Sequence, residues 1–339
     1  MAAHYLDPAL ASLRAAGLAA TPIVVPPGEA TKTLDQAGRL FDALLSAGMD
    51  RGGVVAAVGG GVVTDLAGFV AATYMRGVAW VSVSTSLLGQ VDASVGGKTG
   101  VDHPQCKNLI GAFHQPRAVL CDVSTLATLP EEELRTGLAE VVKHAMIRDA
   151  DLFARLESDA DAVLARDPDV LENVVARNVR IKADVVMADE RESALRRILN
   201  YGHTIGHALE SLAMEAGGRL GGEVLRGGSP HPPRGGEVLT HGRAVALGMM
   251  AEARIAERRG LVAPAVVARQ QRLLERFGLP VRLAPLPDLN RCLALMQHDK
   301  KAEAGRLRFV VPEAVGRVRE LDDVTPDEIR DAVRSLAGG

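Results

Sequence analysis

The strongest constraint on the fold is a strand, turn, helix and strand pattern in the first third of the chain. Residues 54–58 are apolar and rich in valine, which predicts a buried parallel strand, and they lead into the glycines at 59–61. A helix over 62–73 and a second strand over 79–85 follow. Such a unit can place a pyrophosphate at the N-terminus of its helix. The glycines do not match G-x-G-x-x-G, so by themselves they indicate only a tight turn.

Predicted helices surround this unit and dominate the rest of the chain. Apolar residues at helical spacing predict helices over 10–17 and 34–48, and residues 22–25 predict a short buried strand. Beyond Leu129-Pro130 the strand pattern mostly stops and amphipathic helices continue to the end. The sequence therefore predicts an α/β domain over residues 1–128 and a mostly helical domain over residues 129–339.

Length and composition favour a metabolic enzyme. A chain of 339 residues can form two domains, and 39 basic against 42 acidic residues give no general attraction to nucleic acid or membranes. The three cysteines, at 106, 121 and 292, are isolated and odd in number, which argues against a disulfide framework. The sequence shows no apolar span long enough to cross a bilayer. We therefore expect a cytoplasmic protein that acts on a small molecule.

The segment from Arg196 to Glu210 carries the most chemistry. It sets His203 and His207 four residues apart, on one face of a helix, with Asn200 one turn and Arg196 two turns upstream. Imidazoles in this arrangement suit a divalent metal, or one metal ligand beside an acid/base group. On its own such a pair is a weak signal, because a packed or solvated histidine is commoner.

Other parts of the chain supply partners for this pair. Glu140 and Lys143 lie one turn apart on a predicted helix, and His241 opens an apolar helix. Glu140, His203 and His241 would form a three-ligand site with the open position that a catalytic zinc needs. A run from Gln90 to Asn108 is rich in lysine and glycine and suits an anion.

These blocks, in this order, resemble the 3-dehydroquinate synthase family of sugar-phosphate cyclases, from about Gly28 to the region of Lys301. The resemblance implies a Rossmann-like NAD-binding domain, here without the family's first strands, followed by a mostly helical metal- and substrate-binding domain. It also implies conversion of 3-deoxy-D-arabino-heptulosonate 7-phosphate to 3-dehydroquinate and phosphate. The steps would be transient oxidation by NAD, β-elimination of phosphate, re-reduction and aldol cyclisation.

The same resemblance implies residues for each ligand. Glu140, His203 and His241 would hold Zn2+ or Co2+. The NAD-binding positions would be Glu29, Lys32, Gly60, Gly61, Val62, Asp65, Thr85, Ser86, Lys98, Lys107, Thr125 and Thr128. In this chain Ser86 stands where the family usually has threonine, and it keeps the hydroxyl.

The substrate would be a sugar acid phosphate, bound by residues that the resemblance also assigns. Lys182 and Arg196 would bind its carboxylate, and Asp92 and Lys143 would lie around its ring hydroxyls together with Glu140. Its phosphate would be bound by Lys98, Asn108, Asn200, His207, Lys300 or Lys301, and Arg76 from the neighbouring subunit of a homodimer.

Three features depart from the family pattern. The opening strands are absent, which implies either a shortened sequence or weakened NAD binding. Arg243 replaces a usual glutamate two residues after His241, so we expect weaker support of that ligand. The connection from His203 to His241 is long and contains Gly-Gly-Glu-Val-Leu twice, at 221–225 and 235–239, which predicts a surface excursion.

Other functions therefore stay open at the level of sequence. An aminodehydroquinate synthase, or another sugar-phosphate cyclase of secondary metabolism, shares the fold, NAD and metal. A metal-dependent alcohol dehydrogenase of related fold would explain NAD and three ligands but not the lysine-rich anion pocket. A decayed paralogue without activity is the alternative that is not an enzyme. Lys182 and Arg196 together favour a substrate with a carboxylate.

Overall fold

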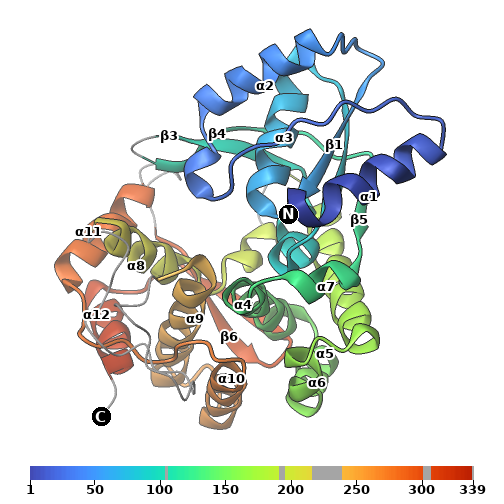
Figure 1. Ribbon diagram of the computed structural model, residues 1–339. Helices are drawn as coiled ribbons and strands as arrows, with labels where there is room; N and C mark the ends of the chain where they lie inside the picture. The colour runs from blue at the N-terminus through green and yellow to red at the C-terminus, as the bar shows by residue number, and fades with distance from the viewer. Residues whose placement is uncertain (104–105, 191–194, 216–238, 301–306, 338–339) are drawn as a thin grey trace. The chain divides into compact units, whose positions relative to one another are not determined.

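The computed structural model describes residues 1–103, 106–190, 195–215, 239–300 and 307–337 (Figure 1). It divides into two compact units, Met1–Leu134 and Arg135–Gly339, which are described separately below. Within the described ranges, no helix is both long and apolar enough to cross a membrane.

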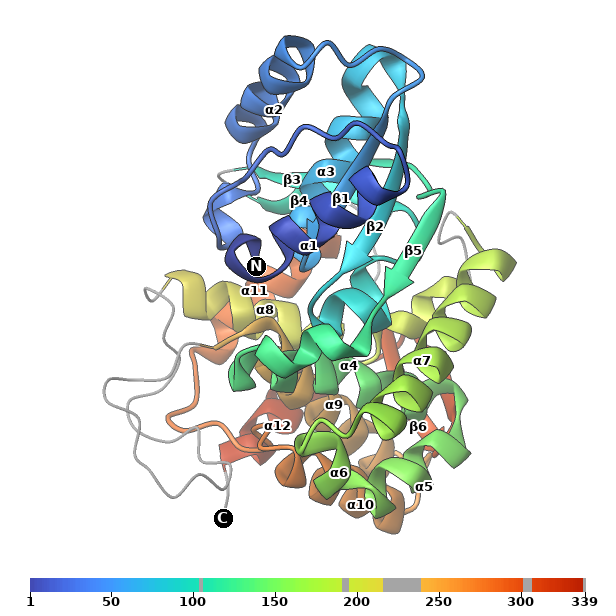
Figure 2. The same cartoon turned by 45° about the vertical axis from the view of Figure 1, so that its right-hand side comes forward.

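A three-stranded parallel sheet organises the first unit, as the valine-rich pattern predicts. Its order is β1 (Val54–Gly59), β2 (Ala79–Ser84) and β5 (Ala118–Cys121), and Figure 2 shows β2 and β5 side by side. Helix α3 (Gly61–Thr73) connects β1 to β2. The predicted strand–helix–strand unit is therefore present, with boundaries shifted by a residue or two.

The remainder of this unit packs around that sheet. Helices α1 (Ala2–Ala15) and α2 (Leu34–Ser46) precede it, and an antiparallel pair, β3 (Lys98–His103) and β4 (Cys106–Phe113), follows β2. Short helical turns lie at Glu29–Thr31, Tyr74–Arg76, Gly89–Ala93 and Val123–Thr128. The core forms where α2 and α3 bury Leu40, Leu44, Leu66, Phe69 and Val70 together with Trp80 and Val101.

Two local predictions need correction. The strand expected over 22–25 is wrong: these residues have no strand pairing, and Val24 is 60% exposed. Proline at positions 22, 26 and 27 removes the backbone donors that a strand would need there. The helix expected over 10–17 begins much earlier, at Ala2, and tolerates Pro8 in its second turn.

The second unit is mostly helical. Its helices are α4 (Glu131–Arg148, which begins in the first unit), α5 (Ala150–Ser158), α6 (Ala160–Leu164), α7 (Pro168–Ala188), α8 (His203–Glu215), α9 (His241–Arg258), α10 (Pro264–Arg276), α11 (Leu289–Lys300) and α12 (Pro326–Arg334). Short 3-10 turns lie at Leu195–Asn200 and Ser335–Ala337. Sequence reading did not foresee the antiparallel pair β6 (Phe309–Ala314) and β7 (Arg317–Leu321).

Helix α9 lies at the centre of this unit. It packs against α8, α10, α12 and β6 (Figure 1), and nearly every residue from Gly242 to Ala256 is buried. Residues 244–251 of this helix are all apolar, and a stretch that is apolar on every side must be enclosed by other elements.

The contact between α8 and α9 depends on glycine. A Cβ atom on Gly248 would lie 1.9 Å from the carbonyl oxygen of Gly202, and one on Gly206 would lie 2.9 Å from that of Ala244. The two backbones therefore approach more closely than any side chain allows, which fixes the distance between the two helices.

Two glycine-to-alanine substitutions should have opposite effects on stability. Gly248→Ala should lower the free energy of unfolding by about 3 kcal/mol or more, because the new methyl group collides with backbone. Gly38→Ala, inside α2 with nothing within 4 Å of its Cβ position, should raise it by about 0.5–1 kcal/mol through helix propensity. Urea unfolding of the two variants measures both values, and equal effects would contradict the tight α8–α9 contact.

Candidate active site

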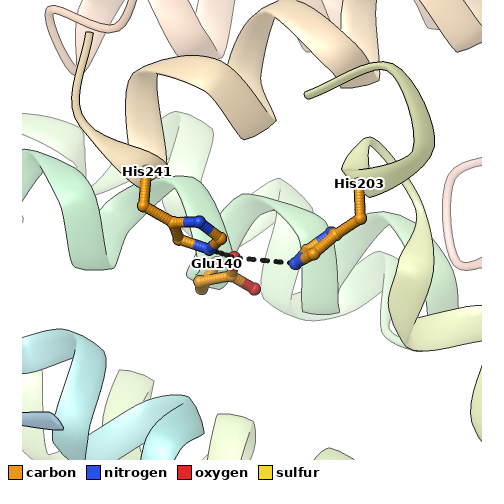
Figure 3. Close-up of side chains that lie close together, drawn as sticks. All are labelled: Glu140, His203 and His241. Carbon is orange, nitrogen blue, oxygen red and sulfur yellow. Dashed lines mark ion pairs between the residues drawn. The ribbon is translucent and has the colours of Figure 1, made fainter. Parts of the chain in front are cut away.

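Three side chains of the second unit converge at the starts of two helices (Figure 3). Glu140 comes from α4, while His203 and His241 are the first residues of α8 and α9. The Nε2 atoms of His203 and His241 lie 3.6 and 3.4 Å from the same oxygen, Oε1 of Glu140. Gly242 permits this approach, because a Cβ there would lie 2.5 Å from the Cα of Thr136, one turn before Glu140.

The chemistry of this donor set suits a divalent cation. One oxygen and two imidazole nitrogens lie within 4.8 Å of one another, and zinc and cobalt both accept such ligands. Each histidine also has a partner for its other nitrogen. Nδ1 of His203 lies 3.2 Å from the carbonyl oxygen of Tyr201, and Nδ1 of His241 lies 3.3 Å from Oε2 of Glu210. These contacts direct both Nε2 atoms toward Glu140 and leave them available to a metal.

The pKa values of His203 and His241 are shifted strongly, and in opposite directions. Lys143 forms an ion pair with Glu140, and both side chains are almost completely buried. Burial and the charge of Lys143 lower the pKa of His203 well below its usual value. Burial also lowers the pKa of His241, but Glu140 and Glu210 outweigh it and raise that pKa to about 10. A cation that binds Nε2 of His241 must therefore displace a proton.

Several predicted anion-binding residues belong to the same unit. His207 lies one turn along α8, with its ring 5.1 Å from that of His203 and 5.9 Å from that of His241. Lys182 on α7 is 7% exposed and Arg196 is 2% exposed. Arg196 is held in place by Asp189, which accepts its backbone N–H at 3.0 Å, and by the carbonyl oxygen of Glu190 at 2.6 Å. Asn200 ends the turn before α8.

The first unit carries a separate group that suits a nucleotide. Helix α3 starts directly after the glycines, and in the described part of the chain no side chain hydrogen bond caps its first turn at Gly60. A Cβ on Gly60 would lie 3.1 Å from Oγ of Ser86, so a larger residue would crowd this turn. Uncapped backbone N–H groups at a helix start bind phosphate well. These are features that the pyrophosphate of NAD requires.

Lys32 links the residues predicted on the adenosine side. Its Nζ donates to Oδ2 of Asp65 at 2.6 Å and also contacts Oδ1 of Asn108. Burial lowers the pKa of Lys32, but the nearby carboxylates of Asp65, Glu29 and Asp102 together outweigh burial and raise it. Burial likewise raises the pKa of nearby Glu29. Asn108 has a left-handed φ of 53° and contacts Lys32, one of the residues predicted to bind NAD. The resemblance assigns Asn108 to the substrate phosphate instead.

Thr125 and Thr128 lie in a turn that two other residues hold. Gln90, completely buried, donates through Nε2 to the carbonyl oxygens of Ser84 and Asp122 and to Oγ1 of Thr125. The hydroxyl of Tyr5 donates to the carbonyl oxygen of Thr125 at 2.9 Å and lies 2.5 Å from Oγ1 of Thr128. Sequence reasoning missed both Gln90 and Tyr5.

The other predicted residues are placed as follows. Val62 and Asp65 lie on α3, Thr85 follows β2, Asp92 lies in the turn Gly89–Ala93, Lys98 begins β3 with an exposed side chain, and Lys107 lies on β4. Arg76 is exposed with a left-handed φ of 67°. The side chain of Lys300, all of Lys301 and the repeats at 221–225 and 235–239 lie outside the described residues.

Glu210 supplies the support for His241 that was expected to be weakened by Arg243. Arg243 is buried in the first turn of α9, but the carboxylate that contacts His241 comes from α8, at Glu210. The chain thus has a carboxylate partner for His241 without a glutamate at position 243. Its signal in the sequence is the spacing of seven residues from His203 to Glu210, which is two helical turns on one face.

Comparison with known proteins agrees with this arrangement. The 3-dehydroquinate synthase N-terminal family model matches residues 22–136, and the C-terminal model matches residues 137–223 and 233–302. A 3-dehydroquinate synthase of Symbiobacterium thermophilum is 47% identical over 333 residues, which cover 98% of this chain and 87% of the relative. One from Geobacter metallireducens is 45% identical, covering 94% of this chain and 84% of the relative.

Solved structures support the fold prediction as well. The 2-epi-5-epi-valiolone synthase ValA of Streptomyces hygroscopicus subsp. jinggangensis, with NAD+ and Zn2+ bound, is 30% identical with a TM-score of 0.87, covering 99% of this chain and 88% of that one. A 2-deoxy-scyllo-inosose synthase with carbaglucose-6-phosphate, NAD+ and Co2+ is 28% identical with a TM-score of 0.81, covering 98% and 86%. The predicted fold class and the resemblance are confirmed: this chain belongs to the 3-dehydroquinate synthase family.

Proposed function

We propose that the protein is a 3-dehydroquinate synthase, a phosphate-eliminating cyclase that converts 3-deoxy-D-arabino-heptulosonate 7-phosphate to 3-dehydroquinate and phosphate. The observation that carries the proposal is the convergence of Glu140, His203 and His241 in a chain 47% identical to a protein of that name. No observation favours a dehydrogenase or an inactive paralogue. The solved dehydrogenases that match, such as a butanol dehydrogenase of Thermotoga maritima at 14% identity, share the fold alone.

The enzyme uses NAD and a divalent cation. Glu140, His203 and His241 would hold Zn2+ or Co2+, because they supply the oxygen and nitrogen ligands that both metals accept. The glycine turn before α3, with Lys32 and Asp65 beside it, would hold NAD. The two solved structures described above, which bind NAD+ with Zn2+ or Co2+, support this assignment.

Two buried cations favour a substrate with a carboxylate. Lys182 and Arg196 lie almost wholly inside the second unit, and both can donate charge-assisted hydrogen bonds to the carboxylate of a ligand. The sugar phosphate of the inosose synthase structure supports a phosphorylated sugar as the substrate class. His207 and Asn200, at the start of α8, would bind the phosphate.

The protein residues bind and orient the substrate. When bound, NAD supplies reversible hydride transfer at C4 of the sugar and the cation polarises the C4 oxygen. Lys143 neutralises Glu140 in a buried position and would donate to a ring hydroxyl. The anion-binding residues would hold the substrate phosphate close to the C5 proton, so that the leaving group itself accepts that proton. The protein then needs no strong base for the elimination.

The proposed enzyme is a cytoplasmic homodimer in which Arg76 reaches the phosphate site of the neighbouring subunit. Arg76 is exposed in a sharp turn between Met75 and Gly77, all with positive φ, which presents its side chain to solvent. Cys121 and Cys292 are free thiols, as a reducing compartment allows. Light scattering after gel filtration tests the dimer, and a monomer at assay concentrations would contradict it.

A substrate comparison tests the proposed specificity. The protein, supplied with NAD+ and Zn2+, should release phosphate from the heptulosonate phosphate with a kcat/KM at least about 100-fold above that for a keto-sugar phosphate without the carboxylate. Mass spectrometry should identify the product as 3-dehydroquinate. A preference for the substrate without the carboxylate, or for an aminated one, would replace this activity with that of another cyclase.

A further inference from the structure

A buried carboxylate, Glu252, lies close to the three predicted metal ligands without being one of them. Glu252 lies in the middle of α9 and is 0% exposed, between Ala251 and Ala253 in a tightly packed helix. An ionised carboxylate in such surroundings loses its hydration and needs strong compensation. Burial raises the pKa of Glu252 to about 8, and backbone hydrogen bonds act in the opposite direction.

Those hydrogen bonds come from the start of α8. The N–H of Gly202 donates to Oε2 of Glu252 at 2.6 Å, and the N–H of Ile205 donates to Oε1 at 3.4 Å. The N–H of Thr204 contributes as well. The first N–H groups of a helix have no partner within it, so Glu252 performs from α9 the function that a capping residue normally performs from the same helix.

His203 lies within the segment that Glu252 caps. It follows Gly202 directly, and its Nδ1 contacts the carbonyl oxygen of Tyr201. Gly202 has a φ of 80°, and a Cβ there would lie 2.5 Å from Cγ of Met249 and 2.8 Å from the carbonyl oxygen of Val245. The backbone that carries His203 is therefore pressed onto the helix that carries His241.

We propose that Glu252 is a positioning residue for the metal site: by capping α8 from α9 it fixes His203 relative to His241 and so sets the affinity for the cation. This inference rests on the proposed metal-dependent function. Glu252 accepts hydrogen bonds from the backbone N–H groups of Gly202, Thr204 and Ile205, so its effect passes through this stretch of backbone. A three-ligand site gains affinity when its ligands are held in place before the metal binds.

Cobalt titration of two variants tests the proposal. In Glu252→Gln one oxygen is replaced by an NH2 group that faces backbone N–H groups, so α8 loses part of its cap. Co2+ binding, followed by visible absorption, should weaken by about 10-fold or more. The control is Gln270→Leu. It removes a completely buried amide, whose Oε1 accepts a hydrogen bond from the Tyr201 hydroxyl at 2.7 Å, and leaves the hydrogen bonds at the start of α8 in place. Its cobalt affinity should match the wild type, even if its Tm falls.

Two outcomes would overturn the proposal. One is equal cobalt affinity for Glu252→Gln and the wild type; the other is an equal loss in both variants that follows their fall in Tm. A wild-type protein that binds no cobalt would instead overturn the proposed function itself, and the inference with it.

A measurement on the unaltered protein covers the case in which Glu252→Gln does not fold. Because coupling between two sites is reciprocal, Co2+ should slow amide hydrogen exchange at Gly202, Thr204 and Ile205. The amides of Leu40 and Leu44 in α2 belong to the other unit and should be unchanged. Unchanged exchange at the start of α8 would contradict the proposed coupling.

Discussion

Replacement of Glu140 by glutamine is expected to abolish metal binding and turnover together. The substitution removes the anionic member of the predicted ligand set and turns an amide toward the Nε2 atoms of His203 and His241. Loss of a supporting residue around a metal ligand already costs about 10- to 100-fold in affinity, so loss of a ligand should cost more than about 100-fold. Zinc content after dialysis and phosphate release measure the two effects.

A matched substitution on the same helix separates this effect from general damage. Glu133→Gln changes the same side chain on α4 at an exposed position. It should keep full zinc content and activity. Glu140→Gln also removes the ion pair between Glu140 and buried Lys143, so the thermal unfolding of this variant should be measured in parallel. A folded Glu140→Gln protein with unchanged zinc content would show that the cluster is not the metal site.

Lys182→Met should weaken use of the carboxylated substrate selectively. The substitution keeps the length of the buried side chain and removes a hydrogen bond to a charged group, which is worth about 1.5–3 kcal/mol. The expected loss in kcat/KM is therefore about 10- to 150-fold. Most of it should appear in KM, because the carboxylate is not part of the reacting centre.

Two comparisons make this prediction specific. Arg180→Met removes a positive charge from an exposed position of the same helix, α7, and should leave kcat/KM unchanged. For a keto-sugar phosphate without the carboxylate, Lys182→Met and the wild type should perform alike. Equal losses on both substrates would assign Lys182 to the reaction itself or to the fold, and would remove the argument for a carboxylated substrate.

Local patterns allowed much of the fold to be predicted. Valine at 54, 55 and 58 followed by glycines identifies β1 and the turn into α3, because a short valine-rich run that ends in glycines is typical of a buried parallel strand. The apolar stretch after His241 identifies α9 for the same reason. The pairs β3–β4 and β6–β7 escaped notice, since strand pairing depends on residues far apart in the sequence and their patterns are mixed.

The candidate site was likewise predictable only in part. The spacing of His203 and His207 marks one helix face, and the resemblance supplied Glu140 and His241 as partners from other helices. Neither spacing nor resemblance identified Glu252, because a glutamate between two alanines on a helix is normally predicted to be exposed to solvent. Its function depends on which helix packs over it, and that information is present only in the folded chain.

The proposed activity is tested by phosphate release from 3-deoxy-D-arabino-heptulosonate 7-phosphate, measured with NAD+ and Zn2+ and with or without a chelator. We expect release that the chelator abolishes, one 3-dehydroquinate for each phosphate, and no net accumulation of NADH, because NAD is regenerated within each turnover. Absence of release from a folded protein loaded with zinc and NAD would contradict it.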